Sequence, residues 1–167
     1  MQISKPDNFY DLVVVGGGMV GASFCCALEQ TLGETPLSIL VIEAISPNTN
    51  SAKQSSFDAR STALSFGSRK FLEGIGLWQA LDDAISAIHE IQVSDRGRLG
   101  CVEINRDGQG VEALGYVVEN KRLGQVLDAR LSESGKINLL CPALVSSVKA
   151  TENGMLLGRN HAATETS

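Results

Sequence analysis

A glycine-rich turn near the start of the chain is the feature most able to do chemistry. Gly16, Gly18 and Gly21 form a G-x-G-x-x-G pattern that follows an apolar run and opens a helical pattern. In this arrangement the first glycine permits a tight turn, the second lets the backbone approach a pyrophosphate, and the third lets helix and strand pack closely. The first-turn N–H groups then face the phosphate charges. The turn therefore indicates a dinucleotide site, the other interpretation being a glycine-rich turn that binds nothing.

Two charged residues follow the motif at spacings that suit the same ligand. Glu43 ends the next apolar run, 22 residues after Gly21, where a carboxylate accepts hydrogen bonds from the adenosine ribose and disfavours a 2′-phosphate. Arg60 follows the polar loop Ser46–Ser56, and its planar guanidinium could bind two pyrophosphate oxygens at once. The other interpretation of Arg60 is a solvated surface residue.

A β-α-β unit must position the motif. Leu12–Val15 and Ser38–Ile42 are short aliphatic runs without polar alternation, which is typical of strands covered on both faces. Met19–Leu32 carries Val20 and Phe24 at helical spacing, which predicts a helix between the two strands.

The rest of the chain is predicted to mix helices with antiparallel strands. Apolar residues at helical spacing predict helices at Ser61–Ile75, Leu77–Ile85 and Leu123–Ser134. Alternation and short apolar runs predict strands at Ile91–Val93, Val102–Ile104, Tyr116–Val118, Ile137–Leu140, Leu144–Val148 and Met155–Leu157. The first two of these form a hairpin around the turn Asp95–Gly100, and the polar tail from Gly158 is expected to fray.

Composition excludes several classes of protein. The 167 residues carry a net charge of −5, which argues against nucleic acid as the main partner. The longest aliphatic runs are four residues, too short for a membrane span, and the N-terminus lacks a signal-peptide core, so a cytoplasmic location is expected. The four cysteines lack C-x-x-C spacing, and His89 and His161 lack nearby ligand partners, so no metal is expected.

Several longer stretches carry a family resemblance. VVVGGGMVGASFCCAL, FDARSTALSFGSRKFLEGIGLW, IHEIQVSDRG and GYVVENKRLGQVL, together with Glu43, are similar to the aromatic-ring flavoprotein monooxygenases of the p-hydroxybenzoate hydroxylase type. Within that family the sequence most resembles the ubiquinone-biosynthesis branch that includes 2-polyprenyl-6-methoxyphenol hydroxylase. The similarity runs from about Asp11 to Val148.

The resemblance implies FAD as the cofactor. It places the three motif glycines at the pyrophosphate, Glu43 at the adenosine ribose and Arg60 at the phosphates. Many relatives have an Arg or Gln on the flavin side near the start of a later helix, where this sequence has Asn120, with Arg122 as the weaker candidate. Asp95 and Arg96 fall in the region of the substrate domain, where a surface ion pair explains them equally well. No catalytic side chain is identified, because the flavin itself performs the oxygen chemistry.

The resemblance also implies an α/β fold with a Rossmann-like FAD-binding domain and an inserted antiparallel β segment. The expected divisions are 1–84 for the first part of the FAD-binding domain, 85–118 for the start of the substrate-domain segment, and 119–167 for the continued FAD-binding domain. Family members carry later Asp-Gly and Gly-Asp segments that this sequence lacks. The chain is therefore expected to be a truncated N-terminal fragment, inactive alone.

The expected activity of the whole enzyme is hydroxylation of the aromatic ring of a prenylated phenol, with NAD(P)H and O₂ as co-substrates. Other ubiquinone-biosynthesis proteins, peripheral contact with the inner membrane and homo-oligomerisation are the further partner expectations. Two other functions stay open from the sequence. One is a different FAD or NAD oxidoreductase, such as an amine oxidase, and the other is a non-catalytic assembly domain.

Overall fold

The computed structural model describes residues 9–45, 58–97 and 99–161, which form two compact units. The first unit comprises residues 1–56 and 127–167, and the second comprises residues 57–126. Helix α4 (Asn120–Glu133) runs from the second unit into the first. The predicted loop Ser46–Ser56 lies outside the described residues.

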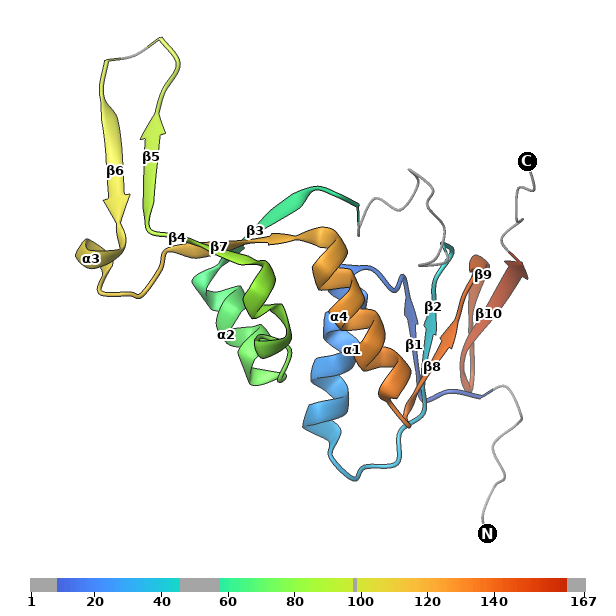
Figure 1. Cartoon of the computed structure of the whole chain (residues 1–167). Helices are drawn as coiled ribbons and strands as arrows, with labels where there is room; N and C mark the ends of the chain where they lie inside the picture. Colours follow the sequence, from blue (N-terminus) through green and yellow to red (C-terminus); the bar gives the residue numbers. More distant parts are fainter. Residues whose placement is uncertain (1–8, 46–57, 98, 162–167) are drawn as a thin grey trace. The chain divides into compact units, whose positions relative to one another are not determined.

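A three-stranded parallel sheet organises the first unit. Its order is β1 (Leu12–Val15), β2 (Ile39–Ile42) and β8 (Ile137–Leu140), and helix α1 (Met19–Leu32) connects β1 to β2. Figure 1 shows α1 on one side of this sheet and the β9–β10 hairpin on the other. The predicted β-α-β order is confirmed, since the two aliphatic runs pair as parallel strands. The central strand β2 is largely buried, as a strand covered on both faces should be, whereas β1 is half-buried and ends at an exposed residue.

Helix α1 buries a different face from the one that its large side chains suggest. The buried residues are Ala22, Cys25 and Cys26, whereas Val20 is 85% exposed and Phe24 is 48% exposed. Val20 and Phe24, whose spacing predicted the helix, therefore do not lie on its buried face. Small side chains on the buried face let the helix lie close to the strands, which large ones would prevent. Burial raises the pKa of both thiols to about 11.

A long hairpin follows β8. Strands β9 (Ala143–Thr151) and β10 (Gly154–His161) pair in antiparallel fashion along their whole length. The expectation of a frayed tail from Gly158 is wrong as far as His161, because ladder hydrogen bonds to β9 hold the backbone whatever its side chains are.

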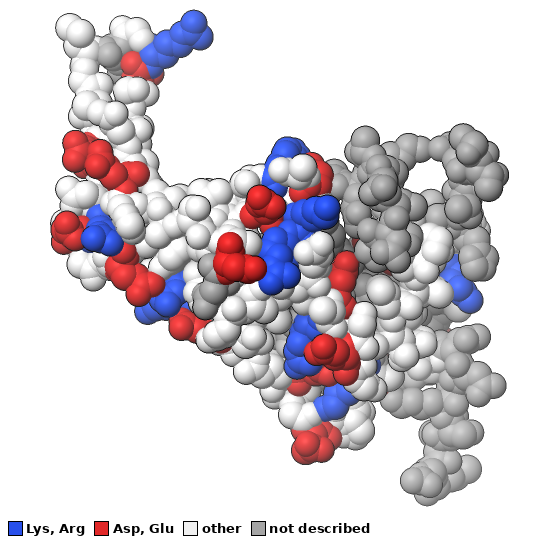
Figure 2. Space-filling view, in the orientation of Figure 1, with Lys and Arg blue, Asp and Glu red and all other residues white. Residues whose placement is uncertain are grey.

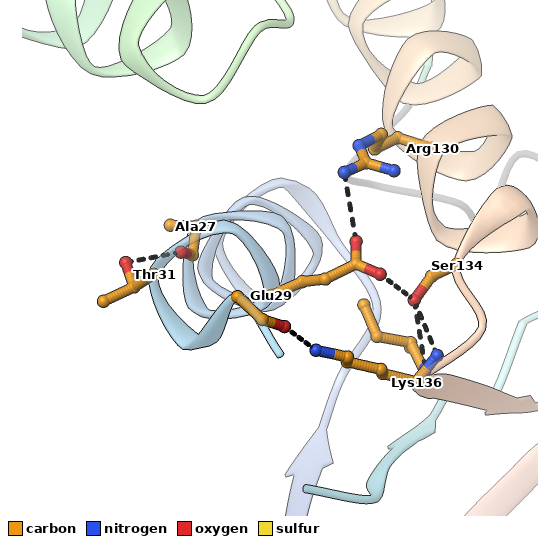
Figure 3. Close-up of polar contacts among 8 residues, drawn as sticks. Ala27, Glu29, Thr31, Arg130, Ser134 and Lys136 are labelled. Atoms are coloured by element: carbon orange, nitrogen blue, oxygen red, sulfur yellow. Dashed lines mark hydrogen bonds and ion pairs between the residues drawn. The ribbon is translucent and has the colours of Figure 1, made fainter. Parts of the chain in front are cut away.

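A polar cluster joins α1 to the end of α4 (Figure 3). The hydroxyl of Ser134 donates to Glu29 Oε1 at 2.5 Å and accepts from the backbone N–H groups of Lys136 and Ile137 at 3.1 Å each. Arg130 pairs with the second oxygen of the same carboxylate at 3.2 Å. This cluster ties α1 to α4 and to the residues that lead into β8.

The second unit is built on an antiparallel sheet. Its order is β3 (Ser61–Ser65), β7 (Gly115–Glu119) and β4 (Ile85–Ile88), with helix α2 (Phe66–Gly74) and a 3₁₀ helix (Gln79–Ala84) beside it. Trp78 and Tyr116 meet edge to face, with ring centroids 4.9 Å apart. The buried apolar residues of this unit are Leu72, Leu77, Trp78, Leu81, Ala113, Tyr116, Val118, Leu123 and Val126.

Two predicted helices are partly wrong. The first five residues of the predicted helix Ser61–Ile75 form β3, in which exposed and half-buried positions alternate. The helix begins after Ser65, whose side chain accepts a hydrogen bond from the N–H of Ser68. Ile85 also belongs to a strand, since it pairs with Val118. In both cases, pairing with β7, which lies far along the chain, makes the residues form a strand.

The predicted hairpin is confirmed as β5 (Glu90–Ser94) and β6 (Cys101–Asn105), and Figure 1 shows it standing away from β4. Asp95 and Arg96 lie in the connection between the two strands. Cross-strand pairs place four apolar side chains on one face of this hairpin: Ile91 opposite Ile104 and Val93 opposite Val102. A short helix, α3 (Arg106–Gln109), follows.

Charged residues of both signs are interleaved on the face shown in Figure 2, with no broad positive area. The β5–β6 hairpin is mostly uncharged along its length in that view. No helix in the part of the chain that the structure describes is long and apolar enough to cross a membrane.

Candidate dinucleotide-binding site

The glycine turn leaves the start of α1 open to a ligand. Gly16 has a φ of +103°, a conformation that favours glycine, and its N–H donates to the carbonyl of Ile42 at 2.8 Å. Gly18 is the N-cap of α1, no side chain caps the helix, and its first turn holds no acidic residue. The first-turn N–H groups and the helix dipole can therefore receive an anion, as a pyrophosphate requires.

Gly21 lets the helix approach the turn. A Cβ atom at this position would lie 2.0 Å from the carbonyl oxygen of Gly16 and 3.3 Å from Cγ1 of Val14. The first distance is far below any real contact, and the atom that would be met is backbone. Any side chain at this position would therefore push α1 away from β1.

Glu43 is held against the same turn. Its Oε2 accepts from the N–H of Gly17 at 2.7 Å, and its Oε1 accepts from the N–H of Ile45 at 2.9 Å. The backbone is fixed as well, because the N–H of Glu43 donates to Leu140 and its carbonyl accepts from Ala143. Each carboxylate oxygen keeps a further lone pair that could accept from a ribose hydroxyl.

Two residues near Glu43 were missed by sequence reasoning. Burial, with the Glu43 carboxylate as a smaller cause, raises the pKa of Asp128. Burial and the charges of Glu43 and Asp128 also raise the pKa of Cys141, whose thiol contacts the carbonyl of Ile45 at 3.4 Å. Nothing in the sequence indicates this neighbourhood, because Asp128 belongs to α4 and Cys141 follows β8.

In the second unit, Arg60 is paired with Asp58. The carboxylate accepts from the backbone N–H of Arg60 at 3.0 Å and from its Nε at 2.5 Å. The backbone hydrogen bond is the largest cause that lowers the pKa of Asp58, and the guanidinium adds to it. The Arg60 side chain is 70% exposed, so the ion pair leaves most of its surface open to solvent.

Asn120 is buried, with 4% of its surface exposed. Its Oδ1 accepts from the hydroxyl of Thr62 at 2.5 Å, and its Nδ2 donates to Asp58 at 3.3 Å. Arg122, the weaker candidate for the same role, donates instead to the carbonyl of Ala80 at 2.9 Å. A direct role of Asn120 at a cofactor stays a prediction.

The structure thus brings the predicted residues together in two groups. The first unit contains Gly16, Gly18, Gly21 and Glu43, and the second contains Arg60 and Asn120. Asp58 was the one missed residue with a sequence signal, since an aspartate two residues before Arg60 can accept its N–H in an Asx turn. No three His, Cys, Asp or Glu side chains among the described residues are placed to hold a metal ion.

Curated proteins of related sequence carry ubiquinone-biosynthesis names. Ubiquinone hydroxylase UbiL of Rhodospirillum rubrum is 32% identical over 150 residues, which cover 89% of this chain and 33% of that protein. The mitochondrial ubiquinone biosynthesis monooxygenase COQ6 of Rattus norvegicus is 31% identical over 118 residues, covering 70% of this chain and 24% of the relative. The chain thus spans about a third of the length of the first relative. No model of a protein family matches it.

Solved structures show the same fold. PqsL of Pseudomonas aeruginosa, described as a probable FAD-dependent monooxygenase, has a TM-score of 0.68 at 17% identity and covers 93% of this chain and 40% of that one. The flavin-dependent monooxygenase PieE, solved with FAD and substrate, has a TM-score of 0.70 at 14% identity and covers 95% of this chain and 28% of that one.

These matches define the class first: the chain has the mixed α/β fold of the FAD-dependent monooxygenases. Its relatives by sequence are a ubiquinone hydroxylase and ubiquinone-biosynthesis monooxygenases. The family resemblance expected from the sequence is confirmed.

Proposed function

We propose that the chain is the N-terminal FAD-binding part of a monooxygenase that hydroxylates the aromatic ring of a prenylated phenol in ubiquinone biosynthesis. The observation that best supports this proposal is the start of α1, which no side chain caps. Glu43 lies next to it and accepts a hydrogen bond from the N–H of Gly17. The names of the relatives support the chemistry. The proposal includes the Rossmann-like start of the FAD-binding domain. It also keeps the predicted domain boundaries, between residues 84 and 85 and between residues 118 and 119.

The residues present fit the adenosine diphosphate half of FAD. The first turn of α1 offers N–H donors to the pyrophosphate, and no side chain caps this end of the helix. Glu43 would accept from the ribose hydroxyls, and Arg60 would contribute a cation for the phosphates. When bound, FAD supplies the redox chemistry of oxygen insertion, and the task of this chain is to bind and orient it.

The co-substrates and partners follow from that chemistry. Hydroxylation by a flavin needs a hydride donor and O₂, and we propose NAD(P)H as the donor. A prenylated phenol partitions into lipid, so we propose peripheral contact of the whole enzyme with the inner membrane from the cytoplasmic side. Association with other ubiquinone-biosynthesis proteins, or with a second copy, belongs to the same proposal.

Removing the two charged residues should weaken FAD unequally. We expect Arg60→Ala to cost about 1.5–3 kcal/mol of FAD binding, the scale of a charge-assisted hydrogen bond. Glu43→Ala should cost less, because ribose hydroxyls are neutral. The measurement is a titration with FAD followed by amide chemical shifts, which also reports weak binding. An Arg60→Ala protein that binds FAD as tightly as the wild type would make Arg60 a surface residue only.

The 167-residue chain alone should bind FAD weakly and show no hydroxylase activity. It spans about a third of the length of UbiL, and the contacts predicted for its glycine turn, Glu43 and Arg60 address only the adenosine diphosphate half of the cofactor. A flavin ring left in water loses the burial that offsets its ordering cost. The test is NAD(P)H-dependent hydroxylation of a prenylated phenol with added FAD. Product formed by the purified chain would show that the catalytic site is more compact than proposed.

A further inference from the structure

A chain of hydrogen bonds in the second unit runs from a buried amide to an exposed cation. The hydroxyl of Thr62 donates to the amide oxygen of Asn120, and the amide nitrogen of Asn120 donates to Asp58. Asp58 in turn holds both the backbone N–H and the Nε of Arg60. Asn120 is buried and the Arg60 side chain is 70% exposed. These hydrogen bonds therefore connect the interior of the second unit to its surface.

The backbone of Arg60 is fixed from both sides by the same residues. Its N–H donates to Asp58 at 3.0 Å, and its carbonyl accepts from the backbone N–H of Asn120 at 2.9 Å. This second bond continues the pairing of β3 with β7, in which Ser61 lies opposite Glu119. The backbone of Arg60, just before β3, is therefore held by Asp58 on one side and by the first residue of α4 on the other.

The amide of Asn120 is suited to this task by its chemistry. An amide has both an acceptor and a donor, and here the acceptor takes the Thr62 hydroxyl while the donor meets the Asp58 carboxylate. A buried polar group is normally satisfied by such partners, and leaving one unpaired is unfavourable. The amide oxygen and the amide nitrogen of Asn120 are thus both bonded to residues within two positions of Arg60.

We propose that Asn120 is a positioning residue, which holds Asp58 and through it presents Arg60 to the phosphates of FAD. This inference rests on the proposed function. It differs from direct contact with the cofactor, which the family resemblance implied for Asn120. A pre-ordered arginine binds an anion more tightly because less side-chain freedom is lost on binding.

The test is a double-substitution cycle on the 167-residue chain, with ADP as the probe and amide chemical shifts as the readout. Asn120→Ala should weaken ADP by about three- to tenfold, the range expected when one rotamer-rich side chain must be ordered on binding. In the Arg60→Ala background, the same substitution should change ADP affinity by less than about twofold, because substitutions that act through one group are not additive. Thr62→Val should also weaken ADP binding, but by less than Asn120→Ala. It replaces Asn120→Ala in the cycle if that variant does not fold.

Two matched controls separate positioning from stability and from charge. Asn105 caps α3 by accepting from the N–H of Gly108 at 2.7 Å, so Asn105→Ala removes another asparagine bond in the same unit. Arg106 pairs with Asp107 at 3.6 Å, so Arg106→Ala removes another arginine paired to a neighbouring aspartate. Both should leave ADP affinity unchanged.

The outcomes of the cycle distinguish positioning of Arg60 by Asn120 from direct contact of Asn120 with the ligand. A loss of ADP affinity from Asn120→Ala that persists in the Arg60→Ala background would overturn the inference, since it would show direct contact. An unchanged affinity for Arg60→Ala alone would overturn it as well. ADP that leaves the Gly16–Gly21 amides unshifted in the wild type would instead overturn the proposed function, so the two failures are distinguishable.

Discussion

Gly21→Ala is expected to destabilise the first unit by about 3 kcal/mol, at the upper end of the usual cost of overpacking. The added Cβ would lie 2.0 Å from the carbonyl oxygen of Gly16. That oxygen belongs to a turn whose N–H is already bonded to Ile42, so it cannot yield without breaking the start of the β-α-β unit. The measurement is urea unfolding of the chain followed by circular dichroism.

Gly135→Ala is the control for this substitution. Gly135 lies in the same unit, its φ is outside the positive region, and a Cβ atom there would meet nothing within 4 Å. The control should therefore unfold at the same urea concentration as the wild type or slightly above it. If Gly21→Ala unfolds together with the control, the close approach of helix and turn is not needed for stability.

Elements whose stabilising contacts are close in sequence could be predicted. The run Leu12–Val15, the glycine turn and the helix Met19–Leu32 are set by local composition, and their bounds agree with β1 and α1. The hairpin of β5 and β6 also follows from local alternation around one turn. In each case the pattern that identifies the element lies within the element or its immediate neighbours.

Features decided by distant partners could not be predicted. The run STALS was expected to be helical, but β7, more than 50 residues later, pairs with it as a strand. The side-chain partners of Asn120 lie 58 and 62 residues away. Glu43, Asp128 and Cys141 likewise come from three separate stretches of the chain. For α1, helical spacing predicted the helix but not which of its residues are buried against the strands. The buried residues are small, because the helix lies close to the sheet.

Gly18→Val should remove most dinucleotide binding and leave the fold intact. Gly18 has φ −66° and ψ −175°, which is extended backbone that any residue adopts, so the substitution introduces no backbone strain. Its side chain would occupy the space that a pyrophosphate needs against the first-turn N–H groups. We expect ADP and FAD to weaken by about a hundredfold or more, since several charge-assisted hydrogen bonds are lost together.

Gly135→Val is the matched control, because it adds the same side chain to the same unit at a position with open space. It should keep wild-type affinity for both ligands. Urea unfolding of the two variants checks that any difference in binding does not come from loss of the fold.

The most direct test of the account is an amide chemical-shift titration of the wild type, Gly18→Val and Gly135→Val with ADP and with FAD. The account predicts saturable shifts at Gly16–Gly21 and at Glu43 in the wild type and in Gly135→Val. It predicts no shifts at these positions in Gly18→Val, which should still show the dispersed spectrum of a folded chain. Equal saturation in Gly18→Val, or wild-type shifts confined to residues outside the turn, would contradict the assignment of this turn to the pyrophosphate of FAD.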